Sequence, residues 1–347
     1  MKLSKYELEA AKWIFRAQDA TPNGGVSKYY AIGKGWCKES YKEVSGYIIP
    51  TLLQLFKKTG EKVYLERAIK IADWELEVQD SEGKWEYVFD TGQVILGLTE
   101  IYHETGEEKY LSSVIKASNW LVRIQDKNGN WSRGEFALGP KNKIKKIFGF
   151  FGNAHNTRTA WALLKVWKIT GKEEYKMAAI KNLNWAVSRQ LKNGYYKDCH
   201  TYAHYLVYTA SGLLESGKIL NGKKFITSAI VFAESCLRVL EKENFLYGNY
   251  DEKWKPLGKR HAALTSNAQL AVLLYKIYFL EGDKRYKIVA DKLISFLQKN
   301  QNLKSGDWGI RGGIPGSYPL NGSYCPNQIL SWATKFYLDM LFVSKRK

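Results

Sequence analysis

A motif that returns along the chain constrains the fold more than any other feature of the sequence. Each copy begins with closely spaced leucines and reaches a short turn that contains glycine. The turns lie at Thr59-Gly60-Glu61, Thr105-Gly106-Glu107, Thr170-Gly171-Lys172, Ser216-Gly217 and Glu281-Gly282-Asp283. Each copy closes on a glycine, one residue and an aromatic residue, at Gly83-Lys84-Trp85, Gly129-Asn130-Trp131, Gly194-Tyr195-Tyr196, Gly248-Asn249-Tyr250 and Gly306-Asp307-Trp308. This self-similarity predicts one supersecondary unit stacked repeatedly on itself.

The spacing of apolar residues indicates that each unit contains two helices of different kinds. The first is apolar over most of its circumference, as in residues 91–98 and 265–278, which predicts a buried helix. The second is amphipathic, because Tyr110, Val114 and Ala117 follow steps of four and three residues. The glycine between the two helices suits a left-handed residue that ends the first one. We therefore expect buried inner helices that alternate with half-exposed outer helices.

The two ends of the chain predict that the array of helices closes on itself. Residues 4–18 form an outer-type helix without an inner partner, and residues 326–343 form an inner-type helix without an outer partner. The last helix is too apolar to cap an open solenoid. The sequence therefore predicts an all-α fold, an (α/α)6 toroid that forms a single domain over residues 1–347. The predicted inner helices are 41–58, 90–104, 156–169, 203–216, 265–280 and 326–343.

The net charge of the chain and its cysteines indicate which binding partners and which cellular compartment to expect. The 347 residues carry a formal net charge of +19, which favours a polyanionic partner such as an acidic polysaccharide or anionic lipid. The lysines are dispersed along helices, so they are equally consistent with solubility alone, and we expect no specific nucleic-acid partner. Cys37, Cys199, Cys236 and Cys325 form no Cys-x-x-Cys motif. With no apolar leader near Met1, these features favour a reduced, cytoplasmic protein.

Polar side chains gather at the predicted starts of the inner helices, which converge at one mouth of the toroid. Free N–H groups and the positive end of the helix dipole suit this mouth to anionic groups. The residues are Glu43, Asp90, Gln93, His155, Asn156, Arg158, His200, His204, Tyr205, Asn267 and Gln269. Any one of them could be a helix cap, but together they predict one cavity. A buried arginine needs an anionic partner, so Arg158 predicts either Asp90 or an acidic substrate group beside it.

Two kinds of catalysis fit these residues. Glu43 and Asp90 could serve as acid and base in glycoside hydrolysis. Alternatively, His200 and Tyr205 could act as base and acid on a carbon acid, as in a uronate lyase or C5-epimerase. Gln93, His155, Asn156, Arg158, His204, Asn267 and Gln269 would then bind substrate, and Trp308 could stack on a sugar ring, although tryptophans of such repeats commonly pack between hairpins. No cofactor or resident metal is expected.

The connection 132–154 interrupts the repeat. Its segment 141–152 joins a basic stretch to an aromatic tip, and long loops of this kind tend to be lids or binding loops. It could close over a substrate, contact anionic lipid at a membrane surface, or pack its aromatic residues into the rim.

Over nearly its whole length the chain resembles the six-hairpin toroid proteins. Within that group it is most similar to the prenyltransferase-like or cyclase-like members found with prokaryotic surface-polysaccharide genes. The resemblance is carried by segments 43–53, 89–94, 156–164, 199–201, 211–215, 264–271 and 315–319. Families that share the barrel include uronyl hydrolases, uronate lyases and epimerases. Terpene cyclases share it too, but they carry an Asp-x-Asp-Asp motif that this sequence lacks.

The resemblance and the residues together imply a carbohydrate-active enzyme that acts on an acidic, uronate-containing glycan, with glycoside hydrolysis favoured. The alternative is a uronate lyase or C5-epimerase. A glycan-binding toroid without catalysis is a third possibility. A fourth is a zinc-dependent cyclase or prenyltransferase-like enzyme, which Cys199-His200 and Cys37 faintly suggest although the expected neighbouring glycines are missing.

Overall fold

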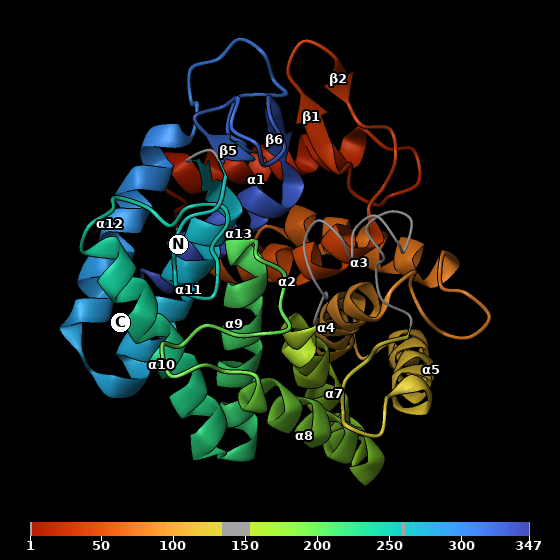
Figure 1. Ribbon diagram of the computed structural model, residues 1–347. Coiled ribbons are helices and arrows are strands. Elements are labelled where there is room, and N and C mark those ends of the chain that lie inside the picture. Colours follow the sequence, from red (N-terminus) through yellow and green to blue (C-terminus); the bar gives the residue numbers. More distant parts are fainter. Residues whose placement is uncertain (1, 134–152, 259–260, 347) are drawn as a thin grey trace.

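The computed structural model describes residues 2–133, 153–258 and 261–346, and in these residues two concentric rings of α-helices form the fold. The inner ring consists of α2 (Lys42–Thr59), α4 (Val88–Thr105), α7 (Thr157–Thr170), α9 (Ala203–Leu220), α11 (Leu264–Glu281) and α13 (Ser331–Val343). The outer ring consists of α1 (Lys5–Asp19), α3 (Lys62–Glu77), α5 (Glu108–Ile124), α8 (Glu173–Ser188), α10 (Lys223–Leu240) and α12 (Lys284–Asn300). The predicted (α/α)6 toroid is confirmed (Figure 1).

Each inner helix packs against the next, and α13 packs against α2 to close the ring. Glycine allows the close approach of neighbouring backbones. A Cβ atom on Gly97 of α4 would lie 2.1 Å from the carbonyl oxygen of Gly46 in α2. A Cβ on Gly212 of α9 would lie 2.4 Å from the backbone of Thr157 in α7. These two contacts explain why glycine stands inside helices that are otherwise strongly apolar.

Four of the five turns inside the hairpins have the predicted geometry. Gly60, Gly106, Gly171 and Gly282 follow their inner helices with φ between 70° and 78°, the left-handed region. Asn221 takes this role after α9, with φ of 50°. Asparagine is one of the few other residues that enters this region readily. The turn predicted at Ser216-Gly217 and the helix end predicted at residue 216 were therefore wrong: α9 continues to Leu220, and Asn221 takes the left-handed position after it.

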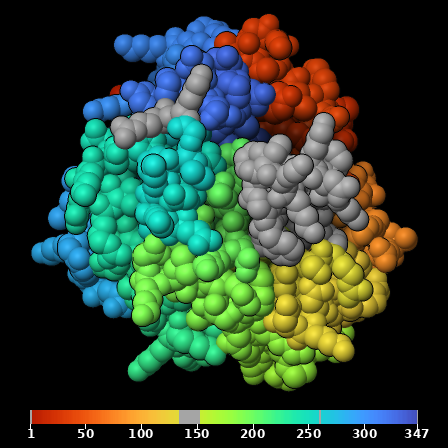
Figure 2. Space-filling view, viewed as in Figure 1, coloured from red at the N-terminus to blue at the C-terminus, as the bar shows by residue number. Residues whose placement is uncertain are grey.

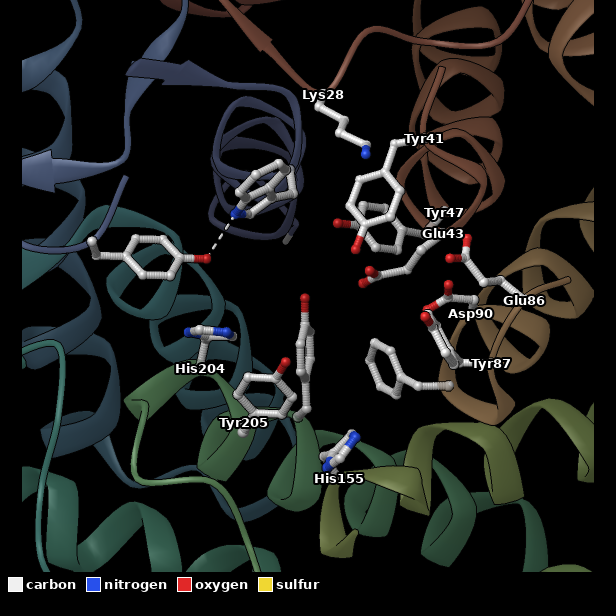
Figure 3. Close-up of a pocket in the computed structure, with 14 residues that line it drawn as sticks. Lys28, Tyr41, Glu43, Tyr47, Glu86, Tyr87, Asp90, His155, His204 and Tyr205 are labelled. Atoms are coloured by element: carbon white, nitrogen blue, oxygen red, sulfur yellow. Dashed lines mark hydrogen bonds between the residues drawn. The ribbon is translucent and has the colours of Figure 1, made fainter. Parts of the chain in front are cut away.

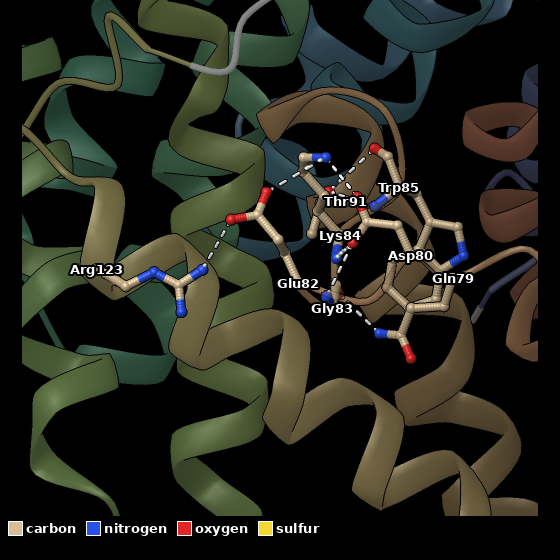
Figure 4. Close-up of polar contacts among 8 residues, drawn as sticks. All are labelled: Gln79, Asp80, Glu82, Gly83, Lys84, Trp85, Thr91 and Arg123. Carbon is tan, nitrogen blue, oxygen red and sulfur yellow. Dashed lines mark hydrogen bonds and ion pairs between the residues drawn. The ribbon is translucent and has the colours of Figure 1, made fainter.

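A repeated glutamine joins neighbouring outer helices. At the end of five outer helices a glutamine Nε2 donates both to a glycine carbonyl in the following turn and to a backbone carbonyl of the next outer helix. The residues are Gln18, Gln79, Gln125, Gln190 and Gln301. We call this arrangement the glutamine clasp. Figure 4 shows Gln79 and the turn that it holds through the Gly83 carbonyl, where Asp80 accepts from the N–H groups of Gly83 and Lys84.

The aromatic residue that closes each repeat packs between hairpins in the first two copies. Trp85 and Trp131 are fully buried, and each indole N–H donates to a backbone carbonyl of the preceding outer helix, at 2.8 and 2.9 Å. Trp308 differs, because it is 59% exposed and lies between the guanidinium groups of Arg16 and Arg311.

Two small sheets, which the sequence did not predict, lie at the mouth of the toroid. One is antiparallel in the order β2 (Gly35–Trp36), β1 (Tyr29–Ala31), β6 (Gln328–Leu330) and β4 (Ile314–Pro315). The other pairs β3 (Ala262–Ala263) with β5 (Ser317–Tyr318). The pairing of β1 with β6 brings the two ends of the chain together, and in Figure 2 the red N-terminal and blue C-terminal parts adjoin.

The prediction for the last inner helix was wrong at its start. Residues 328–330 form β6, and α13 begins at Ser331. The backbone groups of β6 are satisfied by β1 on one side and β4 on the other, which favours the extended conformation over another helical turn. Within the described ranges, none of the helices combines the length and the apolar character needed to cross a bilayer.

Candidate active site

A cavity of about 350 Å³ opens where the inner helices begin. Such a volume lies at the lower end of small-molecule sites, which span roughly 300–1,000 Å³. Tyrosine, phenylalanine and tryptophan make up more than half of the lining residues, and charged residues and histidines supply the rest. The lining residues are Lys28, Tyr41, Glu43, Tyr47, Glu86, Tyr87, Phe89, Asp90, His155, His204, Tyr205, Tyr208, Tyr324 and Trp332.

Carboxyl groups occupy one side of this cavity. Glu43 lies in the first turn of α2 and Asp90 in the first turn of α4, while Glu86 stands just before α4 with a left-handed φ of 45°. Figure 3 shows all three directed toward the cavity from the same side. Because Asp90 is the third residue of its helix, it is not the N-cap, which is Tyr87. The two helix starts therefore bring Glu43 and Asp90 to one wall.

The charge state of Glu43 is set by opposing effects. Burial raises the pKa of its carboxyl group to about 7, although a hydrogen bond from Tyr41 and the positive charge of Arg158 each lower that pKa. The same carboxyl group raises the pKa of the Tyr41 phenol, so Tyr41 stays neutral and donates. Glu43 can therefore hold or release a proton near neutral pH, as a general acid must.

Imidazole and phenol groups occupy the opposite side. His155, His204 and His200 surround the ring of Tyr205, with centroid distances of 4.7, 4.5 and 5.1 Å. Burial lowers the pKa of His155 to about 3 and of His200 to about 4, and it lowers the pKa of His204 strongly. All three are therefore neutral at pH 7. The Nδ1 atoms of His155 and His204 find no hydrogen-bond partner among the described residues.

Arg158 lies below the cavity, where it is 93% buried. Its Nε donates to Oε1 of Gln93 at 2.7 Å, and its guanidinium lies 5.1 Å from the ring centroid of Tyr208. Gln93 is thus a hydrogen-bond partner of Arg158 within the protein, where the sequence suggested Asp90 or an acidic substrate group. Deeper in the barrel, Lys335 pairs with Asp339 at 2.5 Å, and Asp339 also accepts from Thr51 at 2.7 Å.

A comparison with models of known protein families identifies the family of this chain. The family model described as the squalene-hopene cyclase C-terminal domain matches residues 36–210, which is half of the chain. The chain belongs to the squalene-hopene cyclase C-terminal domain family. No curated protein sequence matches significantly. Because folds of this family host different chemistries, the reaction has to be argued from the site itself.

Several solved structures with the same fold as this family member are of sugar-processing enzymes. The unsaturated glucuronyl hydrolase of a Bacillus species has a TM-score of 0.78 at 17% identity and covers 99% of this chain and 96% of its own. The cellobiose 2-epimerase of Bacillus thermoamylovorans has a TM-score of 0.77 at 12% identity, covering 99% and 97%. An α-1,6-mannanase of a Salegentibacter species has a TM-score of 0.67 at 12% identity, covering 98% of each chain. At such identities the likeness concerns the fold.

The structure of this family member brings together five of the residues singled out in the sequence. Glu43, Asp90, His155, His204 and Tyr205 line the cavity. His200 stands behind Tyr205, stacked on Tyr202 at 4.4 Å, and its Nδ1 accepts from the Tyr202 N–H. Gln93, Arg158 and Gln269 lie beneath the cavity; Gln269 adjoins Tyr208 and donates to Thr265.

Three other expected site residues do not line the cavity. Asn267 hydrogen-bonds the backbone of Leu246 in both directions, at 2.8 and 2.9 Å, and so holds the loop before α11. Asn156 is fully buried and accepts from Thr159. Trp308 lies outside, between its two arginines. The expected binding segment 141–152 lies outside the described residues.

Several cavity residues were missed in the sequence. Tyr47 and Tyr208 stand one helical turn after Glu43 and His204, so the period of the helix could have revealed them. Lys28, Glu86 and Tyr324 lie in connections, where no periodic signal exists. Tyr324 reaches the cavity from the connection between β5 and β6, and its hydroxyl accepts from the indole N–H of Trp332 at 3.0 Å.

The donor set near Cys199 fits a structural role better than zinc binding. Burial raises the pKa of the Cys199 thiol to about 12, whereas a zinc ligand must be a thiolate. Its sulfur lies 3.6 Å from the hydroxyl of Thr209, and the Nδ1 atom of the neighbouring His200 accepts a backbone N–H. In the described part of the chain no three His, Cys, Asp or Glu side chains form a metal-binding group.

Proposed function

We propose that the protein is a carbohydrate-active enzyme that hydrolyses a terminal residue from an acidic, uronate-containing saccharide. The observation that carries this proposal is the pair formed by Glu43 and Asp90, which open neighbouring inner helices and face the same cavity. Glycoside hydrolysis needs two carboxyl groups, one protonated and one ionised. The fold, shared with an enzyme named unsaturated glucuronyl hydrolase, supports the same substrate class.

In this proposal Glu43 is the general acid. Protonated Glu43 donates to the oxygen of the bond that breaks, and the leaving saccharide departs with that proton. Asp90 takes a proton from water, whose oxygen attacks the sugar carbon, so that the products together gain one water molecule. The half-aromatic wall supplies faces on which the sugar ring can stack.

The uronate preference rests on charge. Lys28 is the single lysine or arginine among the described residues that line the cavity, and its ammonium lies 5.1 Å from the Tyr41 ring and 3.0 Å from Glu39. A sugar carboxylate entering the cavity would meet this ammonium while Glu43 stays protonated. The net charge of +19 would favour the approach of an acidic saccharide to the surface.

The test is incubation with a panel of uronate-containing oligosaccharides, read by mass spectrometry. We expect products that together gain one water, and we expect Asp90→Asn to abolish turnover while leaving saccharide binding intact. Glu82→Gln is the matched control, because Glu82 is an exposed carboxylate in the turn that precedes the same helix. Full turnover by Asp90→Asn would refute the proposed role.

Elimination or epimerisation at a uronate is the second candidate, and the neutral histidines opposite the carboxyl wall favour it. His204 could take the proton next to the carboxylate and Tyr205 could protonate the leaving oxygen or the opposite face. In that case His204→Ala and Tyr205→Phe are inactive while Asp90→Asn retains turnover. An unsaturated product identifies a lyase, and solvent deuterium in a product of unchanged connectivity identifies an epimerase. Binding without any product would indicate a glycan-binding toroid.

A further inference from the structure

The glutamine clasp is interrupted at one place in the outer ring. Segment 223–258, which contains α10 and the loop after it, has no glutamine. Between the end of α10 and helix α12 the surface is hollowed instead, with a volume of about 590 Å³. The hollow is lined by residues 240–245, by the last half of α12 and by Tyr318. The repeat thus departs from its own pattern where the molecule has this hollow.

This hollow continues into two others. It shares Lys242 and Glu243 with a hollow of about 280 Å³ beside Trp254. It shares Lys299 with a hollow of about 460 Å³ that reaches Leu320. These neighbouring hollows share lining residues, and we call the three together the rim groove. An extended groove suits a polymer better than a small molecule.

Aromatic rings form the floor of the rim groove. Phe245 and Phe296 stack with centroids 5.0 Å apart, and Tyr318 meets both edge-on, at 5.8 and 5.4 Å. Tyr318 is 44% exposed, so it presents a ring to the groove. Trp254 has a left-handed φ of 62°, and its indole N–H donates to the carbonyl of Asn193 at 3.0 Å.

The charges of the groove are mostly positive. Its cations are Arg238, Lys242, Lys292 and Lys299, and its carboxylates are Glu241 and Glu243. Lys242, Lys292 and Lys299 are exposed and make no ion pair with any described residue. Glu243 accepts from the hydroxyl of Tyr247 at 3.0 Å. Unpaired ammonium groups beside aromatic rings match a chain that carries both carboxylates and sugar rings.

One loop links the groove to the catalytic cavity. Tyr318 lines the groove and Tyr324 lines the cavity, on the same short connection. Ser317 ties the ends of this connection together, since its hydroxyl donates to the Tyr324 carbonyl at 2.5 Å and accepts from the Tyr324 N–H at 3.1 Å. A chain that leaves the cavity across this loop would arrive at Tyr318.

We propose that the rim groove binds a stretch of acidic polysaccharide outside the catalytic cavity, with sugar rings on Tyr318 and carboxylates at Lys242 and Lys299. The identity of the polymer rests on the proposed function, since the chain in the groove would be the one whose end is processed. Long acidic chains are therefore held more tightly than short fragments, which the cavity alone can accommodate.

The test measures binding of fluorescein-labelled hyaluronan, as a long chain and as a short fragment, in an Asp90→Asn background. We expect the double variant Lys242→Ala, Lys299→Ala and the single variant Tyr318→Ala each to weaken binding of the long chain by about tenfold. The short fragment should bind unchanged. The matched control is Lys223→Ala, Lys284→Ala, which removes the same charge from exposed lysines at the other ends of α10 and α12. Thermal melting verifies that all variants fold.

The outcomes separate this inference from the proposed function. If Asp90→Asn abolishes turnover but the groove variants bind the long chain with the same affinity as the control variant, the groove proposal is refuted and the hydrolase proposal is supported. If the groove variants lose affinity for the long chain while Asp90→Asn stays fully active, the groove proposal is supported and the hydrolase proposal is refuted. A third outcome is that the lysine double variant loses affinity for hyaluronan and for a DNA duplex equally, while Tyr318→Ala has no effect. The groove would then be a general polyanion-binding surface, and the groove proposal would be overturned.

Discussion

At the scale of single residues, the cavity contains two sets of ionisable groups that burial drives in opposite directions. Burial removes charge from both sets, so it protonates Glu43 and deprotonates His155, His200 and His204. A proton is thus available on one side of the cavity, and proton acceptors are available on the other. Arg158 limits the effect on Glu43, because its positive charge favours the ionised carboxylate.

This arrangement predicts the pH dependence of the reaction. If protonated Glu43 is the acid, kcat/KM falls as the pH rises through about 7. Because the charge of Arg158 lowers the pKa of Glu43, Arg158→Met should raise that pKa and move the falling limb to higher pH. Arg123→Met, at an exposed arginine, is the control. A limb that stays in place, or moves to lower pH, would contradict the role given to Arg158.

At the scale of elements, the glutamine clasp explains how consecutive hairpins keep the same orientation. Each clasp satisfies a carbonyl in the turn after one outer helix and a carbonyl inside the next outer helix. The amide group can serve both because it carries two N–H donors. The turn that the clasp holds then leads into the next inner helix. The turn held by Gln79, for example, leads into α4 (Figure 4). The clasp therefore helps to place Asp90 at the mouth.

Removing one clasp should destabilise the toroid measurably. In Gln125→Leu the carbonyls of Gly129 and Ala178 lose the Gln125 donor, and Gly129 keeps only the Asn182 amide, at a cost of roughly 0.5–1.5 kcal/mol in the free energy of unfolding. The measurement is the midpoint of urea unfolding. Gln298→Leu is the control, since the half-buried Gln298 side chain donates to no described residue. An equal midpoint shift in both variants would mean that the clasp contributes nothing specific.

At the scale of the whole molecule, the toroid depends on joining its two ends. The sheet does this at the mouth, through β1 and β6. At another point Glu7 of α1, whose side chain is fully buried, pairs with Lys58 of α2 and with Lys345 after α13. These cations and the hydrogen bonds of Ser4 outweigh the effect of burial and lower the pKa of Glu7 from 4.5 to about 2.

The closure should therefore be sensitive to acid. A carboxyl group whose pKa is lowered on folding stabilises the protein above pH 4.5, and this contribution is lost as the pH falls toward 2. Glu7→Gln should lower the free energy of unfolding at pH 7 by about 3 kcal/mol, because it removes the carboxylate whose pKa folding lowers from 4.5 to about 2. The difference from the unchanged protein should shrink between pH 4.5 and 2. Glu66→Gln, at an exposed carboxylate, should show neither effect in thermal melting.

The sequence by itself determined the architecture, because the repeat is a local signal. Three signals lie within a single hairpin: the spacing of its apolar residues, the glycine at its turn and the aromatic residue that closes it. The helices of one hairpin can therefore be predicted without knowledge of the other hairpins. The same period placed Glu43, Asp90, His155, His204 and Tyr205 at helix starts, and so at one mouth.

The tertiary structure decided what no single hairpin contains. The pairing of β1 with β6 joins segments about three hundred residues apart in the chain, so no local pattern predicts it or the late start of α13. Lys28, Glu86 and Tyr324 reach the cavity from connections, and Asn267 looks like a site residue until its bonds to Leu246 are seen. The pKa of Glu43 depends on burial among neighbours from several helices, which only the closed ring brings together.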